Sequence, residues 1–379
     1  MVQEKKNLNI KSQVRLLLNG LHSKSGGGLN YLINMLPVIA ADKDIELHLC
    51  IHKSQCDLLP QNLENIKIHA FEFTSGFWRL QIHEQIDVPR LAKKIGADVV
   101  FSPANYGPLL VSNSVILLRN SLSVAFIERR LEKLGYWALV YVATLISILF
   151  AKKAIVVSDY ARSVFSNSLV SFFEKRFIVI NHGVSKNFTP PKIGVNRGSF
   201  LLAVSDIYVQ KNFMNLISAF KKLKIDHPYL TLKIAGRAID KDYFKALKKV
   251  IYDNKLDNDI QFLGSVKSDE LVKLYQNCSV FVFPSTVETF GNPLLEAMAC
   301  GAPIACSNTT AMPEIAGNAA KFFDPFNINS MVWVLNSLLK NNKLRQSLSQ
   351  KSLIRSKKFS WEITGDRTLA VIKSIIKSE

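Results

Sequence analysis

The sequence predicts an α/β protein built from two Rossmann-like, doubly wound domains that face each other across a cleft. Three observations lead to this prediction. The chain has 379 residues, more than one ordinary core accommodates. Short apolar runs alternate with longer amphipathic segments, the pattern of βαβ units with parallel strands. The alternation breaks at Pro190-Pro191 and then restarts, so we place a linker near residues 186–198.

Each predicted strand of the first half is a short apolar run bounded by polar or turn residues. The first, Val14–Leu18, precedes a helix predicted at Gly28–Ala40. A second helix is predicted at Gln81–Lys94. The further strands are predicted at Ile45–Ile51, Ile66–Phe71, Val99–Phe101, Val115–Leu118, Ile155–Val157 and Phe177–Ile180.

The second half repeats this alternation, and we therefore predict domains at residues 1–190 and 191–360. Ligands of such sheets bind beyond the carboxyl ends of the strands, so the cleft between the domains is the expected site. A helical pattern at Trp361–Ser378, within residues 361–379, is expected to pack back on the first domain. The second set of strands is predicted at Phe200–Val204, Leu230–Ala235, Ile260–Leu263, Val280–Phe283 and Pro303–Cys306.

Residues Leu134–Ala151 form an uncharged stretch of 18 residues between basic residues. This length just reaches that of a transmembrane segment. Because Ala154–Ser158 follows almost directly and has the pattern of a buried strand, we favour a buried helix that leads into the sheet. A helix lying partly on a membrane and a true membrane span are the alternatives.

The net charge of +18 indicates an anionic partner: nucleotide phosphates, an acidic membrane surface or nucleic acid. The basic residues are scattered rather than interleaved with aromatic ones, which argues against nucleic acid. The five cysteines form no CxxC pair, so neither a disulfide framework nor a zinc site is predicted. Residues 1–13 lack the apolar region of a secretory signal, and we expect a cytoplasmic protein, peripheral on the inner face of a membrane.

The segment Pro284–Gly301, PSTVETFGNPLLEAMACG, carries most of the functional information. A buried strand ends before it, a polar loop follows, and Asn292 with Pro293 is expected to start a helix. Glu288 then lies in the loop, and Glu296 lies on the first turn of the helix. The backbone N–H groups between them suit a phosphate or a sugar hydroxyl, because they lie at a helix N-terminus.

Here the chain resembles glycosyltransferase family 4, whose members have the two-domain GT-B fold. The signature of that family, Glu-x7-Glu, is present as Glu288-TFGNPLL-Glu296, and the segments at 296–317 and 319–325 resemble its continuation. The resemblance implies that Glu296 binds the nucleotide ribose and Glu288 the transferred sugar, with Val266 against the base or in the core. It also implies a donor pocket lined by Phe290, Gly291, Asn292, Pro293 and Leu294.

A departing nucleoside diphosphate needs cations near it, because its negative charge grows in the transition state. Lys211, between a strand and a helix, matches the phosphate-binding lysine of the family. Many relatives carry an arginine five positions earlier, where this chain has Asp206, an acid that is unfavourable there unless it is paired or turned away. Arg237, at another strand end, is a candidate for the second cation.

The glycine triplet Gly26-Gly27-Gly28 follows the first strand and opens a helix. Glycines let the backbone approach a phosphate or sugar closely, and the triplet resembles the first-domain loop of the family. A merely flexible turn is the alternative. The spacing GxGxxG is absent, so a nicotinamide site is not predicted.

Relatives often carry a histidine after a first-domain strand, where this chain has Arg119-Asn120. Arg119 is therefore a candidate for binding the sugar or the acceptor, and a structural ion pair with a carboxylate is the alternative. We interpret His182 as part of an interdomain turn, and His22 alone is weak evidence for a site.

The sequence thus predicts a glycosyltransferase of polysaccharide or glycolipid biosynthesis, with retention implied by the resemblance alone. The expected partners are a nucleotide-sugar donor, a sugar or lipid-linked acceptor and an anionic membrane surface. We expect no cofactor and no obligatory metal, because the Asp-x-Asp motifs at 42–44, 240–242 and 257–259 lie in polar contexts. A nucleotide-sugar epimerase and a catalytically silent sugar-binding subunit are the alternatives.

Overall fold

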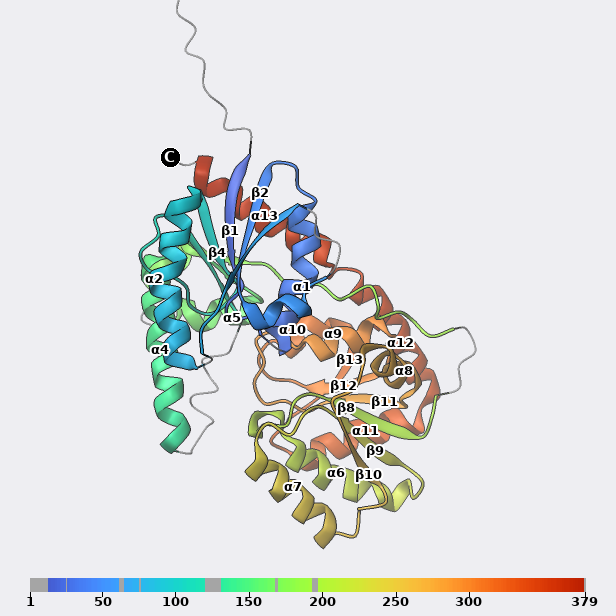
Figure 1. The fold of residues 1–379 in the computed structure, drawn as a ribbon. Helices are drawn as coiled ribbons and strands as arrows, with labels where there is room; N and C mark the ends of the chain where they lie inside the picture. The colour runs from blue at the N-terminus through green and yellow to red at the C-terminus, as the bar shows by residue number, and fades with distance from the viewer. Residues whose placement is uncertain are drawn as a thin grey trace, which may run out of the picture.

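The computed structural model contains two parallel β-sheets, each covered by helices on both faces (Figure 1). This architecture confirms the predicted fold class. The structure describes residues 13–24, 26–60, 65–74, 76–119, 131–167, 170–192 and 197–377. The predicted linker is therefore described only in part, and the domain boundary at residue 190 stays a prediction.

The first sheet has seven parallel strands in the order β3-β2-β1-β4-β5-β6-β7. The order reverses at β1, as expected of a doubly wound sheet. The strands are β1 Val14–Asn19, β2 Ile45–His52, β3 Ile66–Phe71, β4 Val99–Ser102, β5 Ser114–Leu118, β6 Lys153–Val156 and β7 Phe177–Val179.

The second sheet has six strands in the order β10-β9-β8-β11-β12-β13. The last strand, at the edge of the sheet, is absent from the sequence prediction. Only its end residues Ala320 and Phe323 are fully buried, so it lacks a continuous apolar run. The strands are β8 Phe200–Val204, β9 Thr231–Ala235, β10 Ile260–Gly264, β11 Val280–Phe283, β12 Ile304–Ser307 and β13 Ala320–Phe323.

The described helices lie between strands in the chain order, except for three that follow the last strand. In the first domain they are α1 Gly26–Ala40, α2 Phe77–Ile95, α4 Leu131–Phe150 and α5 Asp159–Ser166, with short 3-10 turns η1 Lys53–Leu58 and η2 Ser171–Arg176. In the second they are η3 Val209–Lys211, α6 Phe213–Asp226, α7 Lys241–Asp253, α8 Ser268–Asn277, α9 Asn292–Ala299, α10 Met312–Ala316, η4 Gly317–Ala319, α11 Ile328–Lys340 and α12 Asn342–Ser356.

The last helix, α13 Trp361–Lys377, returns to the first domain and packs beside α1 (Figure 1). The Thr364 hydroxyl donates to the carbonyl of Asn181 at 2.8 Å. Lys373 forms an ion pair with Asp42 at 2.8 Å. The chain therefore crosses between the domains a second time, as the sequence pattern predicts.

The long apolar helix α4 differs from the buried helix that the sequence favours. Its Val140 and Ile148 are buried, but Val142, Ile146 and Leu149 are 50%, 38% and 46% exposed. A run of uncharged residues does not reveal that one side of a helix faces outward, which is why the favoured interpretation is wrong for the exposed side of this helix. No helix in the described ranges is both long and apolar enough to cross a membrane.

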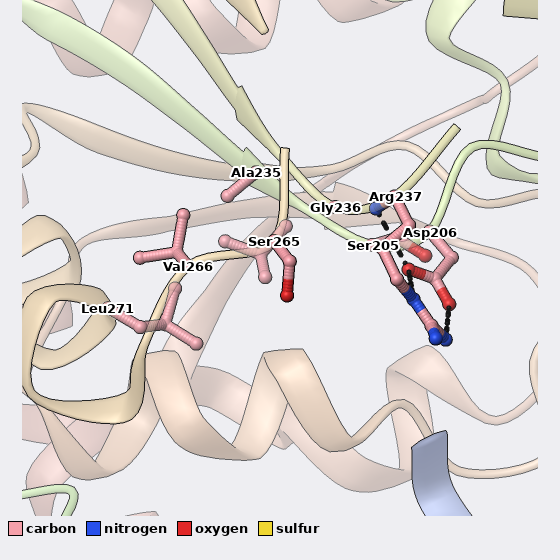
Figure 2. Close-up of a pocket in the computed structure, with 9 residues that line it drawn as sticks. Ser205, Asp206, Ala235, Gly236, Arg237, Ser265, Val266 and Leu271 are labelled. Atoms are coloured by element: carbon pink, nitrogen blue, oxygen red, sulfur yellow. Dashed lines mark hydrogen bonds and ion pairs between the residues drawn. The ribbon is translucent and has the colours of Figure 1, made fainter. Parts of the chain in front are cut away.

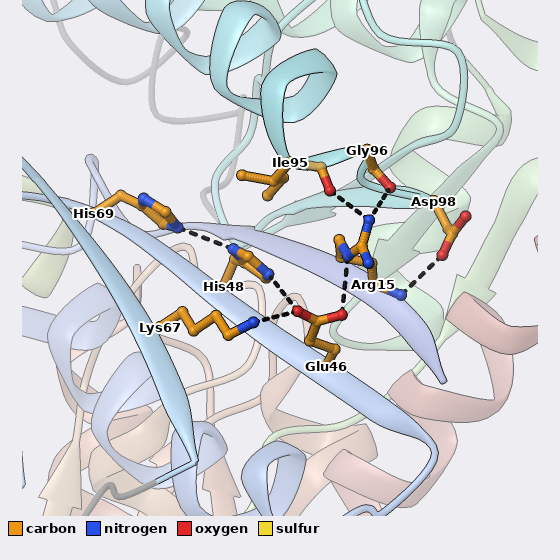
Figure 3. Close-up of polar contacts among 8 residues, drawn as sticks. All are labelled: Arg15, Glu46, His48, Lys67, His69, Ile95, Gly96 and Asp98. Carbon is orange, nitrogen blue, oxygen red and sulfur yellow. Dashed lines mark hydrogen bonds and ion pairs between the residues drawn. The ribbon is translucent and has the colours of Figure 1, made fainter. Parts of the chain in front are cut away.

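A polar cluster joins the amino ends of β1, β2 and β3 (Figure 3). Glu46 accepts hydrogen bonds from Lys67 at 2.5 Å and from Arg15 at 2.9 Å. These two bonds and one from His48 lower the pKa of Glu46 to about 2. His48 in turn contacts His69 at 2.9 Å, with the two rings stacked. Because the cluster lies at the opposite sheet edge from the carboxyl ends of the strands, we assign it to the stability of the sheet.

Candidate nucleotide-sugar site

A pocket opens at the carboxyl ends of β8, β9 and β10 (Figure 2). The predicted base contact, Val266, lies in it beside Leu271 of α8. The other lining residues are Val204, Ser205, Asp206, Ala235, Gly236, Arg237 and Ser265. This position is the one expected for a ligand of a doubly wound sheet.

Asp206 and Arg237, at the mouth of this pocket, bind each other (Figure 2). The Arg237 guanidinium donates to both carboxylate oxygens of Asp206, at 2.7 and 3.2 Å. The backbone N–H of Arg237 adds a third bond at 2.9 Å. The bonds to Arg237 outweigh burial and lower the pKa of Asp206. Asp206, which is unfavourable beside a diphosphate unless it is paired, is therefore paired. Its partner is Arg237, the arginine predicted as the second cation.

Lys211 and Glu288 form an ion pair with an Nζ–Oε1 distance of 2.5 Å. Their side chains are 17% and 14% exposed, so the pair lies in a partly desolvated position. The neighbouring Asn212 anchors the turn of Lys211, because its amide donates to the carbonyls of Pro284 and Pro325 at 3.1 and 2.8 Å. Two segments that are far apart in the sequence thus present one cation and one carboxylate together.

The helix that follows this loop begins one residue earlier than predicted. Gly291 has a φ of 90° and occupies the N-cap position, while Asn292 is already helical. A left-handed φ favours glycine, and the predicted cap at Asn292 is therefore wrong. Because of this shift, Glu296 lies at the start of the second turn of α9 rather than on the first.

Glu296 faces α8, where the Tyr275 hydroxyl donates to its carboxylate at 3.0 Å. Burial raises the pKa of Glu296 to about 7, against the opposing effect of that hydrogen bond. Leu271, on the same helix as Tyr275, lines the pocket described above. Glu296 therefore contacts α8, the helix that contributes Leu271 to the pocket, and is only partly exposed.

Not every residue predicted to line the donor pocket offers its side chain to a ligand. Phe290 and Leu294 are 3% and 0% exposed and belong to the core. The ring of Phe290 packs against His182 and Phe359. Such residues can contact a ligand only through their backbone. Gly291 and Pro293 lie with Asn292 at the start of α9.

His182 lies where the two domains and α13 meet. Its Nδ1 is 3.2 Å from the side-chain oxygen of Asn292, and its ring stacks on Trp361. Burial lowers the pKa of His182 to about 4, so the imidazole is neutral at physiological pH. These contacts confirm the interpretation of His182 as part of an interdomain turn.

The glycine triplet lies opposite the start of α9. A Cβ atom built at Gly27 would be 3.7 Å from the amide nitrogen of Asn292, and one built at Gly28 would overlap the guanidinium of Arg119. Gly28 thus makes room for Arg119. The helix α1 already starts at Gly26, two residues before the predicted start.

Arg119 follows β5 and touches both domains. Its backbone N–H donates to the side-chain oxygen of Asn105 at 3.1 Å, and its carbonyl accepts from the Thr289 hydroxyl at 2.5 Å. No carboxylate of the described residues pairs with its guanidinium, so they do not supply the predicted structural ion pair. Asn120, its predicted companion, lies outside the described residues.

Further contacts join the two domains near Arg119. The Ser158 hydroxyl donates to the carbonyl of Thr289 at 2.6 Å. The carboxylate of Glu314 accepts from the backbone N–H groups of Asp159 and Tyr160 at 2.9 and 3.0 Å. The loop of Glu288 therefore faces the first domain rather than open solvent.

A buried polar cluster that was not predicted from the sequence lies beside the glycine triplet. Glu84 of α2 is fully buried, lies 2.9 Å from His22 Nε2 and accepts from Asn19 at 2.7 Å. Asn19 also donates to Ser102, at the end of β4. His22 and Tyr106 stack edge to face. The sequence signal for this cluster is that Asn19 and Ser102 end strands at the carboxyl edge of the sheet. Glu84 gives no such signal, because it lies inside a helical pattern.

The three Asp-x-Asp motifs contribute to local structure. Asp42 and Asp44 both bind Lys373. Asp240 is buried at the N-cap of α7 rather than solvated as expected, and Asp259 is in an ion pair with Lys224. Within the described ranges, no group of three or more His, Cys, Asp or Glu side chains is placed to hold a metal ion. Independence from metals stays a prediction.

Residues 186–354 match the family model of glycosyl transferases group 1. O-antigen chain mannosyltransferase B of Escherichia coli is 27% identical over 237 residues, which are 59% of this chain and 61% of that protein. An uncharacterized glycosyltransferase of Methanocaldococcus jannaschii is 27% identical over 362 residues, which are 92% of this chain and 95% of that protein. The chain thus matches only about three fifths of the length of the mannosyltransferase.

The solved structure of HepE from Anabaena, in complex with UDP-glucose, superposes with a TM-score of 0.75 at 18% identity. The superposition covers 96% of this chain and 100% of HepE, and at this identity it shows the fold alone. The family model, the nearly full-length relative and the two-sheet architecture agree with one another. Residues 186–354 are thus similar to the group 1 glycosyltransferases, and the chain has the GT-B fold.

Proposed function

We propose that this protein transfers a sugar from a nucleotide-sugar donor to an acceptor hydroxyl in polysaccharide or glycolipid biosynthesis. The observation that carries the proposal is the convergence of Lys211, Glu288 and the start of α9 opposite the glycine triplet. Two relatives support it by name: the E. coli protein is a mannosyltransferase, and HepE is solved with UDP-glucose.

The donor is proposed to lie along the carboxyl edge of the second sheet. Its base would occupy the pocket beside Val266, and its ribose hydroxyls would bind Glu296. Its diphosphate would lie at Lys211 and the backbone N–H groups that start α9, where the helix dipole favours an anion. Glu288 would then exchange its bond to Lys211 for the hydroxyls of the sugar.

The proposed reaction is a substitution at the anomeric carbon. The bond from this carbon to the β-phosphate oxygen breaks while the acceptor oxygen bonds to the carbon. The acceptor proton passes to the departing phosphate oxygen. Attack from the face that the diphosphate leaves would retain the configuration. Lys211 and the helix N-terminus stabilise the charge that grows on the diphosphate, which is the step at which fixed cations lower the barrier.

A thermal-shift panel tests the donor proposal, because a ligand stabilises the protein that binds it. UDP-, GDP- and ADP-sugars are each added to the whole chain, and the unfolding midpoint is measured. The sugar nucleotide that raises this midpoint is then incubated with the protein, with and without candidate acceptors. A transferase consumes the donor only with an acceptor or slowly with water. Conversion of the free sugar nucleotide to its epimer would establish a nucleotide-sugar epimerase. Binding without turnover would establish a catalytically silent sugar-binding subunit.

We further propose that the acceptor is lipid-linked and that the first domain contacts an anionic membrane. The exposed residues of α4 form one continuous side of that helix, at positions 138, 142, 146, 149 and 150. Phe172 of η2 is 93% exposed, and the same turn is held against the end of α4 because Arg176 donates to the carbonyl of Ala151 at 2.9 Å. Lys152 and Lys175, both exposed, add positive charge beside this apolar side.

A further inference from the structure

The proposed diphosphate site has fewer available cations than its chemistry requires. Lys211 is available, because a ligand can replace Glu288 as its partner. The charge of Arg237 is already compensated by Asp206, to which its Nε, its Nη2 and its backbone N–H donate. Releasing Arg237 would leave the Asp206 carboxylate unpaired beside a diphosphate, where like charges repel. A second cation whose charge is not compensated by a carboxylate would therefore strengthen the site.

Arg119 is a cation without an anion in the described part of the chain. No carboxylate pairs with its guanidinium, and its Nε is enclosed without a hydrogen-bond partner. Burial lowers the pKa of Arg119 to about 10, while Tyr31 and Tyr106 act in the opposite direction. The guanidinium is therefore charged at neutral pH. A largely enclosed charge that no described carboxylate compensates is costly, and a bound anion would compensate it.

The position of Arg119 agrees with such a ligand. Its guanidinium lies against Gly28, in the first turn of α1, so the N-terminus of that helix is beside it. Its carbonyl is bound by Thr289, the residue next to Glu288. Bonds to Asn105 and Thr289 hold its backbone from both domains. Arg119 is therefore fixed between the glycine triplet and the loop that carries Glu288.

We propose that Arg119 binds the donor diphosphate from the first domain and takes the place of the cation that Asp206 withholds. This inference rests on the proposed function, because it assumes a nucleoside diphosphate in the crevice. Lys211 then grips the diphosphate from the second domain and Arg119 from the first. Donor binding links the two domains through one anion, and a planar guanidinium suits two phosphate oxygens at once.

Isothermal titration with UDP, GDP and ADP tests the proposal, with the corresponding monophosphates as probes that lack the β-phosphate. The whole chain is compared with Arg119→Met, Arg119→Lys and the double variant Asp206→Asn/Arg237→Met, which removes both charges of that pair. Arg119→Met should weaken the diphosphate that the wild type binds by about 10- to 100-fold, the usual worth of charged hydrogen bonds. The matching monophosphate should change by only about threefold. Arg119→Lys should retain part of the diphosphate affinity, and Asp206→Asn/Arg237→Met nearly all of it.

A stability measurement separates this role from a structural one. Because no described carboxylate depends on Arg119, Arg119→Met should leave the unfolding midpoint of the ligand-free protein unchanged or raised. A lowered midpoint with unchanged diphosphate affinity would identify a structural arginine and overturn the inference. A large loss in Asp206→Asn/Arg237→Met but not in Arg119→Met would return the role to Arg237. If the wild type binds none of the nucleotides, the proposed function itself fails.

Discussion

Replacing Lys211 with methionine tests the pair that it forms with Glu288. At 2.5 Å, the Coulomb attraction of two unit charges is about 7 kcal/mol at an effective dielectric constant of 20. Most of this is offset by the desolvation of the two groups. Exposed pairs contribute up to about 1 kcal/mol, and loss of one partner of a buried pair costs about 3–5 kcal/mol. With side chains 17% and 14% exposed, we expect Lys211→Met to cost about 1–3 kcal/mol of unfolding free energy.

The double variant Lys211→Met/Glu288→Gln separates stability from catalysis. Because both charges are removed, its unfolding free energy should return to within about 1 kcal/mol of the wild type. Its transfer rate should stay as low as that of Lys211→Met, about 100- to 1,000-fold below the wild type, the usual effect of removing one group that stabilises a developing anion. Denaturant unfolding and release of nucleoside diphosphate measure the two quantities. If transfer recovers together with stability, Lys211 has only a structural role and the reasoning is refuted.

Three other predictions concern residues outside this pair. The pKa of Glu296 is raised from 4.5 to about 7 in the folded protein. Between these two values the folded state holds a proton that the unfolded state has lost, so the unfolding free energy should fall as pH rises from about 4.5 to 7. Glu296→Gln should flatten this fall in unfolding midpoints measured against pH, and equal slopes would contradict the assignment. Ile146→Glu/Leu149→Glu should abolish flotation with vesicles of anionic lipid and leave nucleotide binding intact, because both positions lie on the exposed side of α4. Unchanged flotation would count against this surface. Glu84→Gln should raise the KM for the acceptor about tenfold with little change in the KM for the donor, because Glu84 orients His22 on the first-domain side. Asp87→Asn is the matched control, since it alters the similar pair with His83 on the same helix. An equal effect of both variants would show a general disturbance of α2.

The sequence predicts the strands well because each is a short apolar run with clear ends. Ile66–Phe71, Phe200–Val204 and Val280–Phe283 have the predicted bounds. The edge strand β13 is missed because Lys321 interrupts its apolar run. The exposed side of α4 is missed because hydrophobicity alone does not tell a core from an uncovered surface.

The candidate site is predictable where its residues are neighbours in the sequence and unpredictable where pairing decides their role. The Glu288-to-Glu296 segment has a local pattern of strand, loop and helix, and the structure keeps that order. The bond between Asp206 and Arg237 joins two strands whose ends meet only in the folded sheet. The contact of Arg119 with Gly28 likewise depends on the packing of β5 beside the glycine triplet. Such contacts decide which cations remain available to a ligand.

The central claim is that the crevice between the domains holds the nucleotide of an activated sugar. A crystal structure of the chain grown with the nucleoside diphosphate that stabilises it most tests this directly. We predict the base beside Val266, the ribose on Glu296, and the phosphates between Lys211 and Arg119. Density for the nucleotide at any other surface, with the bond between Lys211 and Glu288 intact, would contradict the claim.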